Sequence, residues 1–205
     1  MNNRVVVIDS QIANIGSVMN MCRKIGFKDV VVTNKPTEIL EADRIILPGV
    51  GHYSSAAKLL DELELRDPLN EAVLVNKTPI LGICLGMQLL CNGSDEGEGA
   101  GLGWIPGRCV RFQESADLKV PHMGWNHVEG VAEDCPLTQL TEPHPRFYHV
   151  HSYHIVTEPE YVMFTTTYGT PFISGVYKDN IFGVQFHPEK SHIYGMELLK
   201  IFCNL

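Results

Sequence analysis

The sequence predicts an α/β protein in which a mixed, largely parallel sheet is flanked by helices. Short β-branched runs alternate with amphipathic helical patterns through the first half of the chain, which is typical of a parallel sheet. Runs such as "VVVID" at 5–9 show no polar alternation, which suits strands buried on both faces. The 205 residues suffice for one well-filled core and are few for two. We therefore expect a single domain over 1–205.

In the first half, each predicted strand is followed by a helical pattern. Asn14 is placed to cap the first helix, Gly26 to end it, and Pro36 to begin the second. The expected strands cover 5–9, 29–33, 44–49 and 79–83, and helical patterns begin near 15, 35, 52, 67 and 85.

The second half is rich in strand patterns with few helices between them. "KDN" at 178–180 separates two apolar runs and suits a tight hairpin. The expected strands lie within 103–112, 146–156, 161–169 and 172–186, and a last helix covers 191–205. We expect these strands to add to the parallel core in antiparallel fashion.

Composition argues against several classes of protein. The net charge of −8 and the lack of a basic block argue against nucleic-acid binding. No apolar run approaches the roughly 20 residues that span a membrane. The first residues lack the apolar region of a signal peptide, and the six cysteines form no C-x-x-C pair. We therefore expect a cytoplasmic protein with reduced thiols, no membrane contact and no cofactor.

The strongest chemical signal is "GICLG" at 82–86, where a buried strand runs into a helix. Glycine on either side of Cys84 suits a sharp turn that carries a nucleophile. The following helix N-terminus favours a thiolate, and the N–H of Leu85 can face an oxyanion. Read for packing alone, the same residues would be a buried cysteine at an ordinary turn.

A second signal, "FHPE" at 186–189, ends the last predicted strand. A thiol nucleophile needs a base and an orienting acceptor, which His187 and Glu189 can supply. In an extended segment, residues two apart point the same way. Alone, this ending is typical of a solvated strand end. The presence of the Cys84 turn favours a catalytic role for His187 and Glu189 instead. Both groups would meet at the carboxyl edge of a parallel sheet.

Two further patterns are more ambiguous. The glycine-rich "LPGVGHY" at 47–53 is either a second oxyanion donor or a tight turn before a helix. His149, His151 and His154 alternate along a strand pattern, but no carboxylate or cysteine stands at ligand spacing beside them. We expect these histidines to be structural and predict no metal.

Taken together, "GICLGMQLL", "LPGVG" and "GVQFHPEKS" resemble the three signatures of the class I (triad-type) glutamine amidotransferases. "VPHMGWN" at 120–126 and "FYHVHSY" at 147–153 resemble the glutaminase subunits of imidazole glycerol phosphate synthases. The similarity spans nearly the whole chain in the order of that family. It implies a flavodoxin-like amidotransferase fold.

The resemblance implies a role for each matching residue. Cys84 would attack the side-chain amide of L-glutamine, His187 would act as base and then acid, and Glu189 would orient it. The implied oxyanion donors are Val50 and Leu85, and the implied substrate contacts are Gly49, Gly51, Gln88, Glu96, Ser152 and Tyr153.

The resemblance also implies a (β/α)8-barrel cyclase partner, which would form a heterodimer with this chain and consume the ammonia. The implied interface residues are Asn14, Met123, Trp125 and Lys190. Without the resemblance, Met123 and Trp125 would be read as core. The segment "DSQIAN" at 9–14 departs from the tyrosine- and glycine-containing pattern of the family, which leaves the identity of the partner open.

Three alternatives remain. A paralogous glutaminase could serve a cyclase-like barrel in surface-sugar amidination. A thiol peptidase-like hydrolase could use the same turn, and would differ in its substrate. A non-catalytic docking module would have no reason to retain Cys84, His187 and Glu189 together.

Overall fold

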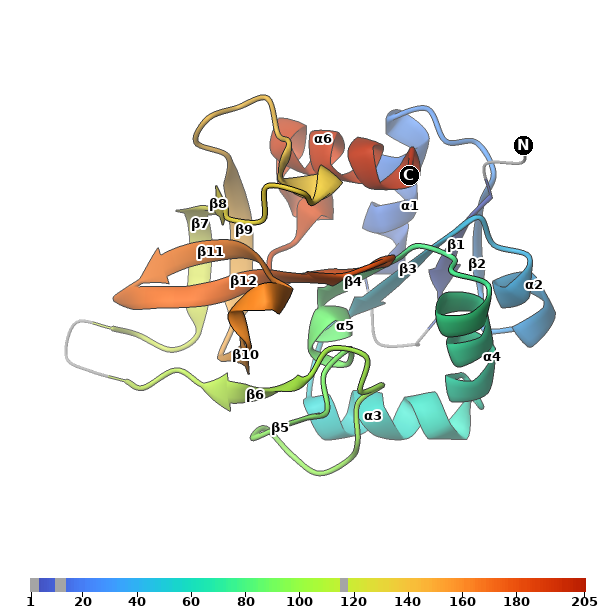
Figure 1. Ribbon diagram of the computed structural model, residues 1–205, viewed down its shortest axis with the longest axis horizontal. Helices are drawn as coiled ribbons and strands as arrows, with labels where there is room; N and C mark the ends of the chain where they lie inside the picture. Colours follow the sequence, from blue (N-terminus) through green and yellow to red (C-terminus); the bar gives the residue numbers. More distant parts are fainter. Residues whose placement is uncertain (1–3, 10–13, 115–117) are drawn as a thin grey trace.

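The computed structural model describes residues 4–9, 14–114 and 118–205, and its centre is a mixed sheet (Figure 1). Adjacent strands β2 (Val30–Thr33), β1 (Val5–Ile8), β3 (Arg44–Gly49), β4 (Ile80–Cys84) and β13 (Ile181–Val184) pair in parallel. This order is the flavodoxin-like one, in which ligands bind beyond the carboxyl ends of the strands. The predicted parallel core is confirmed.

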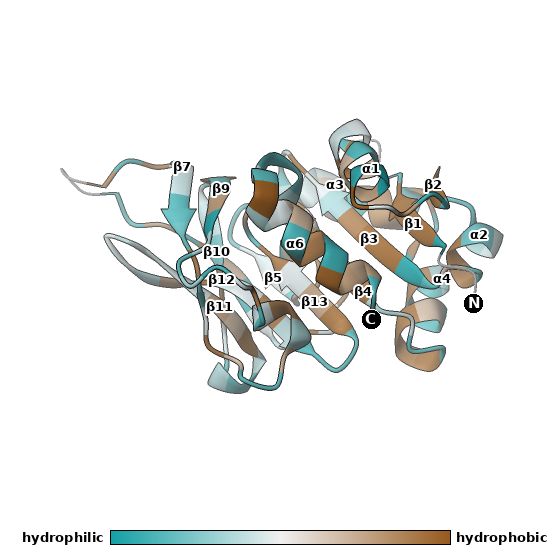
Figure 2. Ribbon diagram, turned by 90° about the horizontal axis from the view of Figure 1, so that it is seen from above, coloured by the Kyte–Doolittle hydropathy of each residue, from teal (hydrophilic) through white to brown (hydrophobic). Residues whose placement is uncertain are grey.

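Helices cover both faces of this parallel half. Along β1, Val5 and Val7 pack with α1 and α6, while Val6 and Ile8 pack with the opposite layer. Figure 2 accordingly colours β1 and the middle of β3 apolar. One layer contains α1 (Ile15–Lys24) and α6 (His192–Cys203); the other contains α2 (Pro36–Leu40), α3 (Tyr53–Glu62), α4 (Arg66–Asn70) and the π-helical turn η1 (Glu71–Val75).

The second half adds antiparallel strands to the same sheet, as predicted. The hairpin between β12 and β13 turns at Asp179, whose φ is 55°. The sheet continues through β12 (Thr170–Lys178), β10 (Tyr153–Thr157), β6 (Gly107–Arg111) and β5 (Gly93–Ser94), the last of which pairs with β6 in parallel. Strand β11 (Val162–Tyr168) branches from β12, and β8 (Glu129–Gly130) pairs with β11.

A second, two-stranded sheet was not predicted. Strand β7 (His122–His127) pairs antiparallel with β9 (Arg146–His151). The sequence pattern treated 146–156 as one strand, but it breaks at Ser152, so that β9 and β10 belong to different sheets. This break places Ser152 at the junction of the two sheets.

The helix ends follow the predictions in part. Gly26 ends α1 with a φ of 106°, and Pro36 occupies the first turn of α2, as expected. Asn14 occupies the N-cap position of α1 as predicted, but its side chain makes no capping hydrogen bond. Residues 10–13 of the "DSQIAN" segment lie outside the described part of the chain.

The close packing of α6 on the turn that follows β13 generates a test. An added Cβ at Gly195 would lie 1.8 Å from the carbonyl oxygen of Pro188, so α6 would have to move away from this turn. We expect Gly195→Ala to lower the free energy of unfolding by about 2–3 kcal/mol, as overpacking does. Urea unfolding measures this change.

Gly16→Ala in α1 is the matched control. An added Cβ there meets nothing within 4 Å, and Gly16 is exposed. Alanine should therefore stabilise the protein by about 0.5–1 kcal/mol, because it loses less backbone entropy in a helix. Equal effects of the two substitutions would contradict the packing of α6 described here.

Candidate active site

Cys84 lies at the sharp turn where β4 ends and the short helix α5 (Leu85–Gln88) begins. Its backbone angles are φ 55° and ψ −111°, a conformation that residues with a Cβ rarely adopt. Such strain persists only where the surroundings enforce it, and it is concentrated at functional sites. The strand–turn–helix context predicted for Cys84 is therefore present.

The flanking glycines explain how this turn is held. An added Cβ at Gly86 would lie 1.8 Å from the carbonyl oxygen of Leu47 in β3. An added Cβ at Gly82 would lie 2.7 Å from the carbonyl oxygen of Gly86 itself. Both glycines thus allow backbone to pack directly on backbone, and this packing presses the turn at Cys84 against β3.

His187 and Glu189 follow β13 in a short 3-10 turn, η4 (Pro188–Lys190). The Nδ1 atom of His187 lies 2.7 Å from Oε1 of Glu189, and both side chains are buried. The expectation of an extended segment is wrong, because Lys190 N donates to the His187 carbonyl and closes the turn. The turn, with Pro188 in its first position, brings the carboxylate to the imidazole.

The electrostatics of His187 favour its charged form. Burial lowers its pKa, but the Cys84 sulfur and the Glu189 carboxylate outweigh that effect and raise the pKa to about 9. Nε2 has no partner at hydrogen-bonding distance among the described residues. Its interaction with Cys84 is therefore a close approach rather than a formed hydrogen bond. An imidazolium near a sulfur is the charge state in which a thiolate forms readily.

Cys84 and His187 line a pocket of about 210 Å³ beyond the carboxyl ends of β3, β4 and β13. Gly49 lies outside this lining, because it packs against Gly86, and Glu189 lies behind His187. The residues that line the pocket are Val50, Gly51, Cys84, Leu85, Gln88, Glu96, Val150, His151, Ser152, Tyr153 and His187.

The two predicted oxyanion donors follow the neighbouring strands β3 and β4, and both line this pocket. Leu85 is the first residue of α5, so the helix itself does not use its N–H. Val50 follows β3 in a loop where Gly51 has a φ of 98°, and 37% of Val50 is exposed. The loop is therefore open to solvent beside the thiol.

Glu96 lines the pocket but also has a structural contact that the sequence did not indicate. Its Oε2 accepts a hydrogen bond of 2.8 Å from the backbone N–H of Tyr53. Tyr53 is the first residue of α3, so this carboxylate satisfies a free N–H at the helix N-terminus. One carboxylate oxygen is thus engaged by the fold.

Gln185, between β13 and His187, is a site residue that the sequence analysis missed. It is fully buried, and its Nε2 donates to Sγ of Cys84 at 3.7 Å. In the sequence it looked like one position of an apolar strand, and a buried glutamine among aromatic neighbours was the available signal.

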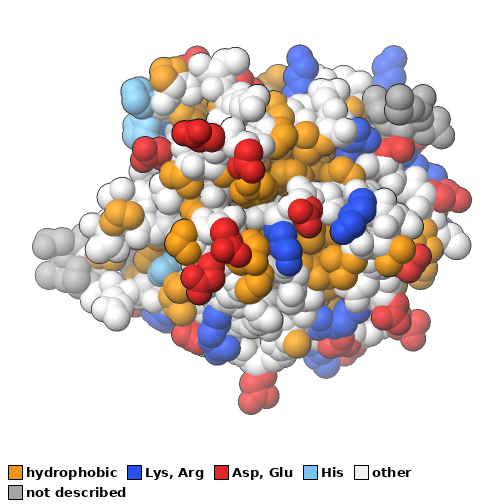
Figure 3. Space-filling model, viewed as in Figure 1, with side chains coloured by type: hydrophobic (Ala, Val, Ile, Leu, Met, Phe, Trp, Pro, Cys, Tyr) orange, Lys and Arg blue, Asp and Glu red, His pale blue; other side chains and the backbone are white. Residues whose placement is uncertain are grey.

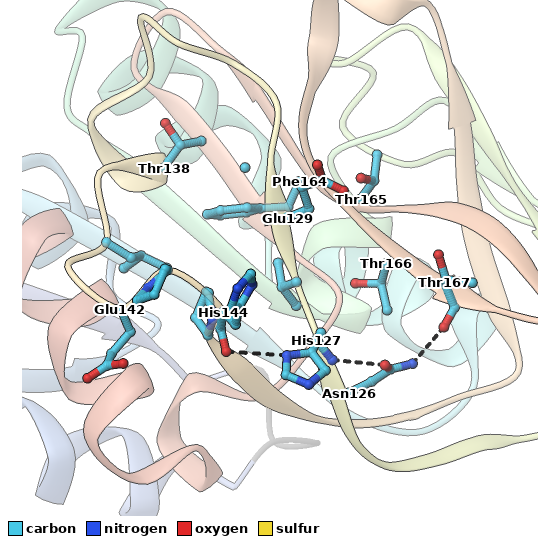
Figure 4. Close-up of a pocket in the computed structure, with 15 residues that line it drawn as sticks. Asn126, His127, Glu129, Thr138, Glu142, His144, Phe164, Thr165, Thr166 and Thr167 are labelled. Carbon is cyan, nitrogen blue, oxygen red and sulfur yellow. Dashed lines mark hydrogen bonds between the residues drawn. The ribbon is translucent and has the colours of Figure 1, made fainter.

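A larger cavity of about 650 Å³ lies between β7, β11 and the segment 138–145 (Figure 4). Its lining contains neither Cys84 nor His187. Figure 4 shows the Asn126 amide held between His127 and Thr167, with hydrogen bonds of 2.8 Å to the backbone of each. This contact fixes which end of the Asn126 amide carries the nitrogen.

Three histidines form a buried cluster beside the active-site pocket. Nδ1 of His122 and Nδ1 of His149 each lie 3.2 Å from Nε2 of His151. The sequence grouped His154 with His149 and His151, whereas the structure places His122 of β7 there. His122 was missed because strand pairing across 29 residues brings it to His151.

The ring nitrogens lie within hydrogen-bonding distance of one another, and the absence of a metal stays a prediction. The rings of His122 and His149 are stacked, with centroids 4.5 Å apart and planes at 26°. Burial lowers the pKa values of His122, His149 and His151 to about 4, 2 and 3.

The residues expected at a partner interface are at the surface. Along β7, His122 points inward, while Met123 and Trp125 are 62% and 43% exposed. The reading of Met123 and Trp125 as core is therefore wrong. Trp125 stacks on His192 at 5.5 Å, and Lys190 Nζ lies 5.7 Å from the Tyr148 ring centre. We call Met123, Trp125, Tyr148, Lys190 and His192 the Trp125 patch.

Asn14, the fourth expected interface residue, is exposed at the start of α1, and α1 packs against η4. On the face seen in Figure 3, acidic and basic side chains are interspersed without a continuous basic stripe. The absence of nucleic-acid binding stays a prediction. Among the described residues, no helix is both long and apolar enough to cross a membrane.

A cysteine on a strained strand–helix turn, a His–Glu pair and a flavodoxin-like sheet together define a triad-type thiol enzyme. The family described as "Glutamine amidotransferase class-I" matches residues 6–204. The chain therefore belongs to the class I glutamine amidotransferases.

Three named relatives are similar to this chain over nearly its whole length. The chain is 49% identical to "Imidazole glycerol phosphate synthase subunit HisH 2" of Methanococcus maripaludis, over 98% of both chains. It is 44% identical to the protein of the same name from Pseudomonas aeruginosa, over 98% and 99% of the two chains. It is also 44% identical to subunit HisH 1 of Campylobacter jejuni, over 98% and 100%.

Solved structures are similar in fold. One titled "Crystal structure of glutamine amidotransferase" has a TM-score of 0.75 at 14% identity, covering 98% of this chain and 99% of that one. A glutamine amidotransferase from Thermotoga maritima has a TM-score of 0.66 at 19% identity, covering 92% and 77%. The amidotransferase fold expected from the sequence is confirmed.

The buried histidines generate a prediction about stability and pH. The folded pKa values of His122, His149 and His151 lie below the reference value of 6.5, so the unfolded chain binds protons first as pH falls. Their contribution is fully present above pH 6.5 and is lost below it. The free energy of unfolding should fall by up to about 1.4 kcal/mol per pH unit for each histidine between pH 6 and pH 5.

His149→Phe is the variant that checks this prediction by urea unfolding at pH 7.5, 6.0 and 5.0. It keeps a ring in place and removes a buried Nε2 that has no hydrogen-bond partner among the described residues. The slope should drop by about a quarter to a third, because His149 is one of four histidines whose pKa burial lowers, His154 being the fourth. His187 adds no slope below pH 6.5, since its pKa is raised. An unchanged slope would contradict the neutral cluster.

Proposed function

We propose that this chain is the glutaminase subunit of an imidazole glycerol phosphate synthase, which hydrolyses L-glutamine and passes ammonia to a synthase subunit. The observation that carries the proposal is the strained Cys84 turn, which shares one pocket with His187. Relatives that are 44–49% identical over nearly their whole length carry the name of this subunit.

In the first half-reaction, His187 takes the Cys84 proton and the thiolate attacks the side-chain amide carbon of glutamine. A carbon–sulfur bond forms, and the oxygen becomes an oxyanion within reach of the N–H groups of Leu85 and Val50. The protonated His187 then gives its proton to the leaving nitrogen. The carbon–nitrogen bond breaks, and ammonia and a γ-glutamyl thioester remain.

In the second half-reaction, neutral His187 accepts a proton from water as the water attacks the thioester. The carbon–sulfur bond breaks and glutamate leaves, its new carboxyl proton going to solvent. His187 returns its proton to the Cys84 sulfur, which restores the starting thiol. Glu189 accepts a hydrogen bond of 2.7 Å from the Nδ1–H of His187 throughout, so Nε2 faces the reacting atoms in both steps. The burial of Glu189 beside His187 keeps the imidazole in one orientation.

The substrate contacts remain those proposed from the resemblance. Gln88, Ser152 and Tyr153 line the pocket that contains the thiol, which supports their assignment to glutamine binding. Glu96 lines it as well and would face the α-amino group through the carboxylate oxygen that does not cap α3. Gly49 and Gly51 would act through their backbone, Gly49 by holding the turn and Gly51 by shaping the loop.

The partner that we propose is a (β/α)8-barrel cyclase subunit bound at the Trp125 patch. An exposed tryptophan and methionine beside a lysine have the composition of an interface centre with a charged rim. The open Val50 loop lies at the same carboxyl end of the sheet as Cys84. A partner that also contacted the Val50 loop would control the second oxyanion donor. We therefore expect a low rate of glutamine hydrolysis without the partner.

A second candidate, a paralogue serving a cyclase-like barrel in sugar amidination, is favoured by one observation. The relatives from three organisms carry numbered names, HisH 2 and HisH 1. The chemistry at Cys84 would be the same, and the two candidates differ in partner. Measuring which purified barrel stimulates glutamine hydrolysis distinguishes them.

The triad assignment predicts the loss of glutamine hydrolysis in Cys84→Ala. Removing the nucleophile should lower kcat by at least about 10³-fold, because no other group can form the thioester. Glutamate release measures it. Cys135→Ala, a buried cysteine outside the pocket, should keep its activity. A glutamine-analogue electrophile should label Cys84; turnover of peptide substrates instead would point to the thiol hydrolase.

The interface assignment predicts that Trp125→Ala weakens binding of the barrel. A central tryptophan typically contributes 2 kcal/mol or more, so Kd should rise by about 30-fold. Titration calorimetry measures it, and glutaminase stimulation should need correspondingly more partner. Val75→Ala, which removes a side chain 65% exposed on η1, is the matched control. Equal effects of the two variants would place the interface elsewhere.

A further inference from the structure

We propose that Gln185 is a further residue of the glutaminase site. Its side-chain amide donates a hydrogen bond to the sulfur of Cys84 and stabilises that sulfur as a thiolate. The inference deepens the proposed function and rests on it for the role of the thiolate. It rests independently on the hydrogen bonds around Gln185.

The contact itself is between Nε2 of Gln185 and Sγ of Cys84, which are 3.7 Å apart. Gln185 is fully buried and Cys84 is 7% exposed, so little water competes for the sulfur. A neutral thiol is a weak acceptor, whereas an ionised acceptor makes a hydrogen bond roughly twice as strong. The same contact therefore favours the thiolate over the thiol.

The neighbouring Gln88 determines which end of the Gln185 amide faces the sulfur. Nε2 of Gln88 lies 3.3 Å from the carbonyl oxygen of Tyr153, and a carbonyl can only accept. The same Nε2 lies 3.1 Å from Oε1 of Gln185. If Gln185 were reversed, two NH₂ groups would face each other. Its nitrogen is therefore directed at Cys84.

The Tyr153 carbonyl is fixed in turn by His151, whose Nδ1 lies 2.8 Å away. The protonation of His151 follows from the far end of the cluster. The backbone contacts of Asn126 in Figure 4 direct its NH₂ group to Nε2 of His122, 3.3 Å away. His122 therefore carries its proton on Nδ1 and donates it to Nε2 of His151.

His151 thus carries its own proton on Nδ1 and donates it to the Tyr153 carbonyl. Both ends of the network, reasoned separately, require the same tautomer. The carbonyl accepts from His151 and Gln88 with its two lone pairs, which leaves neither side chain free to turn. The donor that faces Cys84 is thereby preorganised before substrate binds.

This donor acts at two points of the reaction. When the Cys84 proton moves to Nε2 of His187, the Gln185 N–H stabilises the negative sulfur that remains. When water attacks the thioester, the carbon–sulfur bond breaks and the sulfur leaves as the same anion. Because Gln88 lines the substrate pocket and donates to Gln185, glutamine and sulfur are held by one hydrogen-bonded network.

Gln185→Met tests the proposal, because methionine is similar in length and has no donor. Iodoacetamide modification of Cys84, followed by mass spectrometry of its peptide without glutamine present, reports the thiolate. The pH of half-maximal alkylation rate should rise by about one unit, and kcat/KM at pH 7 should fall about tenfold. Thr166→Val, which removes a buried hydrogen bond to Ser174, should leave the alkylation profile unchanged.

Gln185→Glu is the second variant, for the case in which methionine does not fold. Its carboxylate can still accept from Gln88 but presents an oxygen to the sulfur, so the alkylation profile should move to still higher pH. A folded variant of either kind with a wild-type profile would overturn the proposal. Alkylation of Cys84 requires neither glutamine nor a barrel partner. Wild-type protein that fails to hydrolyse glutamine with any barrel would therefore overturn the proposed function and leave the Gln185 proposal standing.

Discussion

The close approach of Gly86 to the Leu47 carbonyl is the contact on which the site depends. It lets α5 begin directly against β3, and the preceding residue, Cys84, takes a strained conformation with a φ of 55° and a ψ of −111°. The turn exposes the thiol at the carboxyl edge of the sheet, next to the Val50 loop. Strain at one residue costs about 1–3 kcal/mol. The free energy gained by burying the apolar strands on both faces is far larger, so the fold can maintain the strained turn.

A second constraint is that the polar groups around the thiol are buried and must satisfy one another. His187 pairs with Glu189, Gln185 with Gln88, and His151 with the Tyr153 carbonyl. An unpaired group in such a place costs about 1–3 kcal/mol, so each pairing also selects one rotamer and one tautomer. Two nitrogens of this group have no partner among the described residues: Nε2 of His187, which faces the thiol and is used in the reaction, and Nε2 of His149, which is not.

The parts of the fold that the sequence predicted are those determined locally. Apolar runs specified β1, β3 and β4, and glycines around Cys84 specified the turn, because neighbouring residues decide both. What was missed depends on distant pairing: His122 reaches the cluster only through β7–β9, and 146–156 divides between two sheets at Ser152. Gln185 was missed because its partners, Cys84 and Gln88, lie about a hundred residues upstream.

The two-stranded sheet connects the surface to the site through direct hydrogen bonds. On β7, Met123 and Trp125 face outward, while His122 and Asn126 begin the network that ends at Cys84. On β9, the Tyr148 carbonyl accepts from the His187 N–H at 2.9 Å, and the Tyr148 ring belongs to the Trp125 patch. Strand residues alternate in direction, so one rigid ribbon presents a partner surface and supports the catalytic histidine. A partner that shifts β9 on binding would therefore also shift His187, because the backbone of His187 is hydrogen-bonded to Tyr148 of that strand.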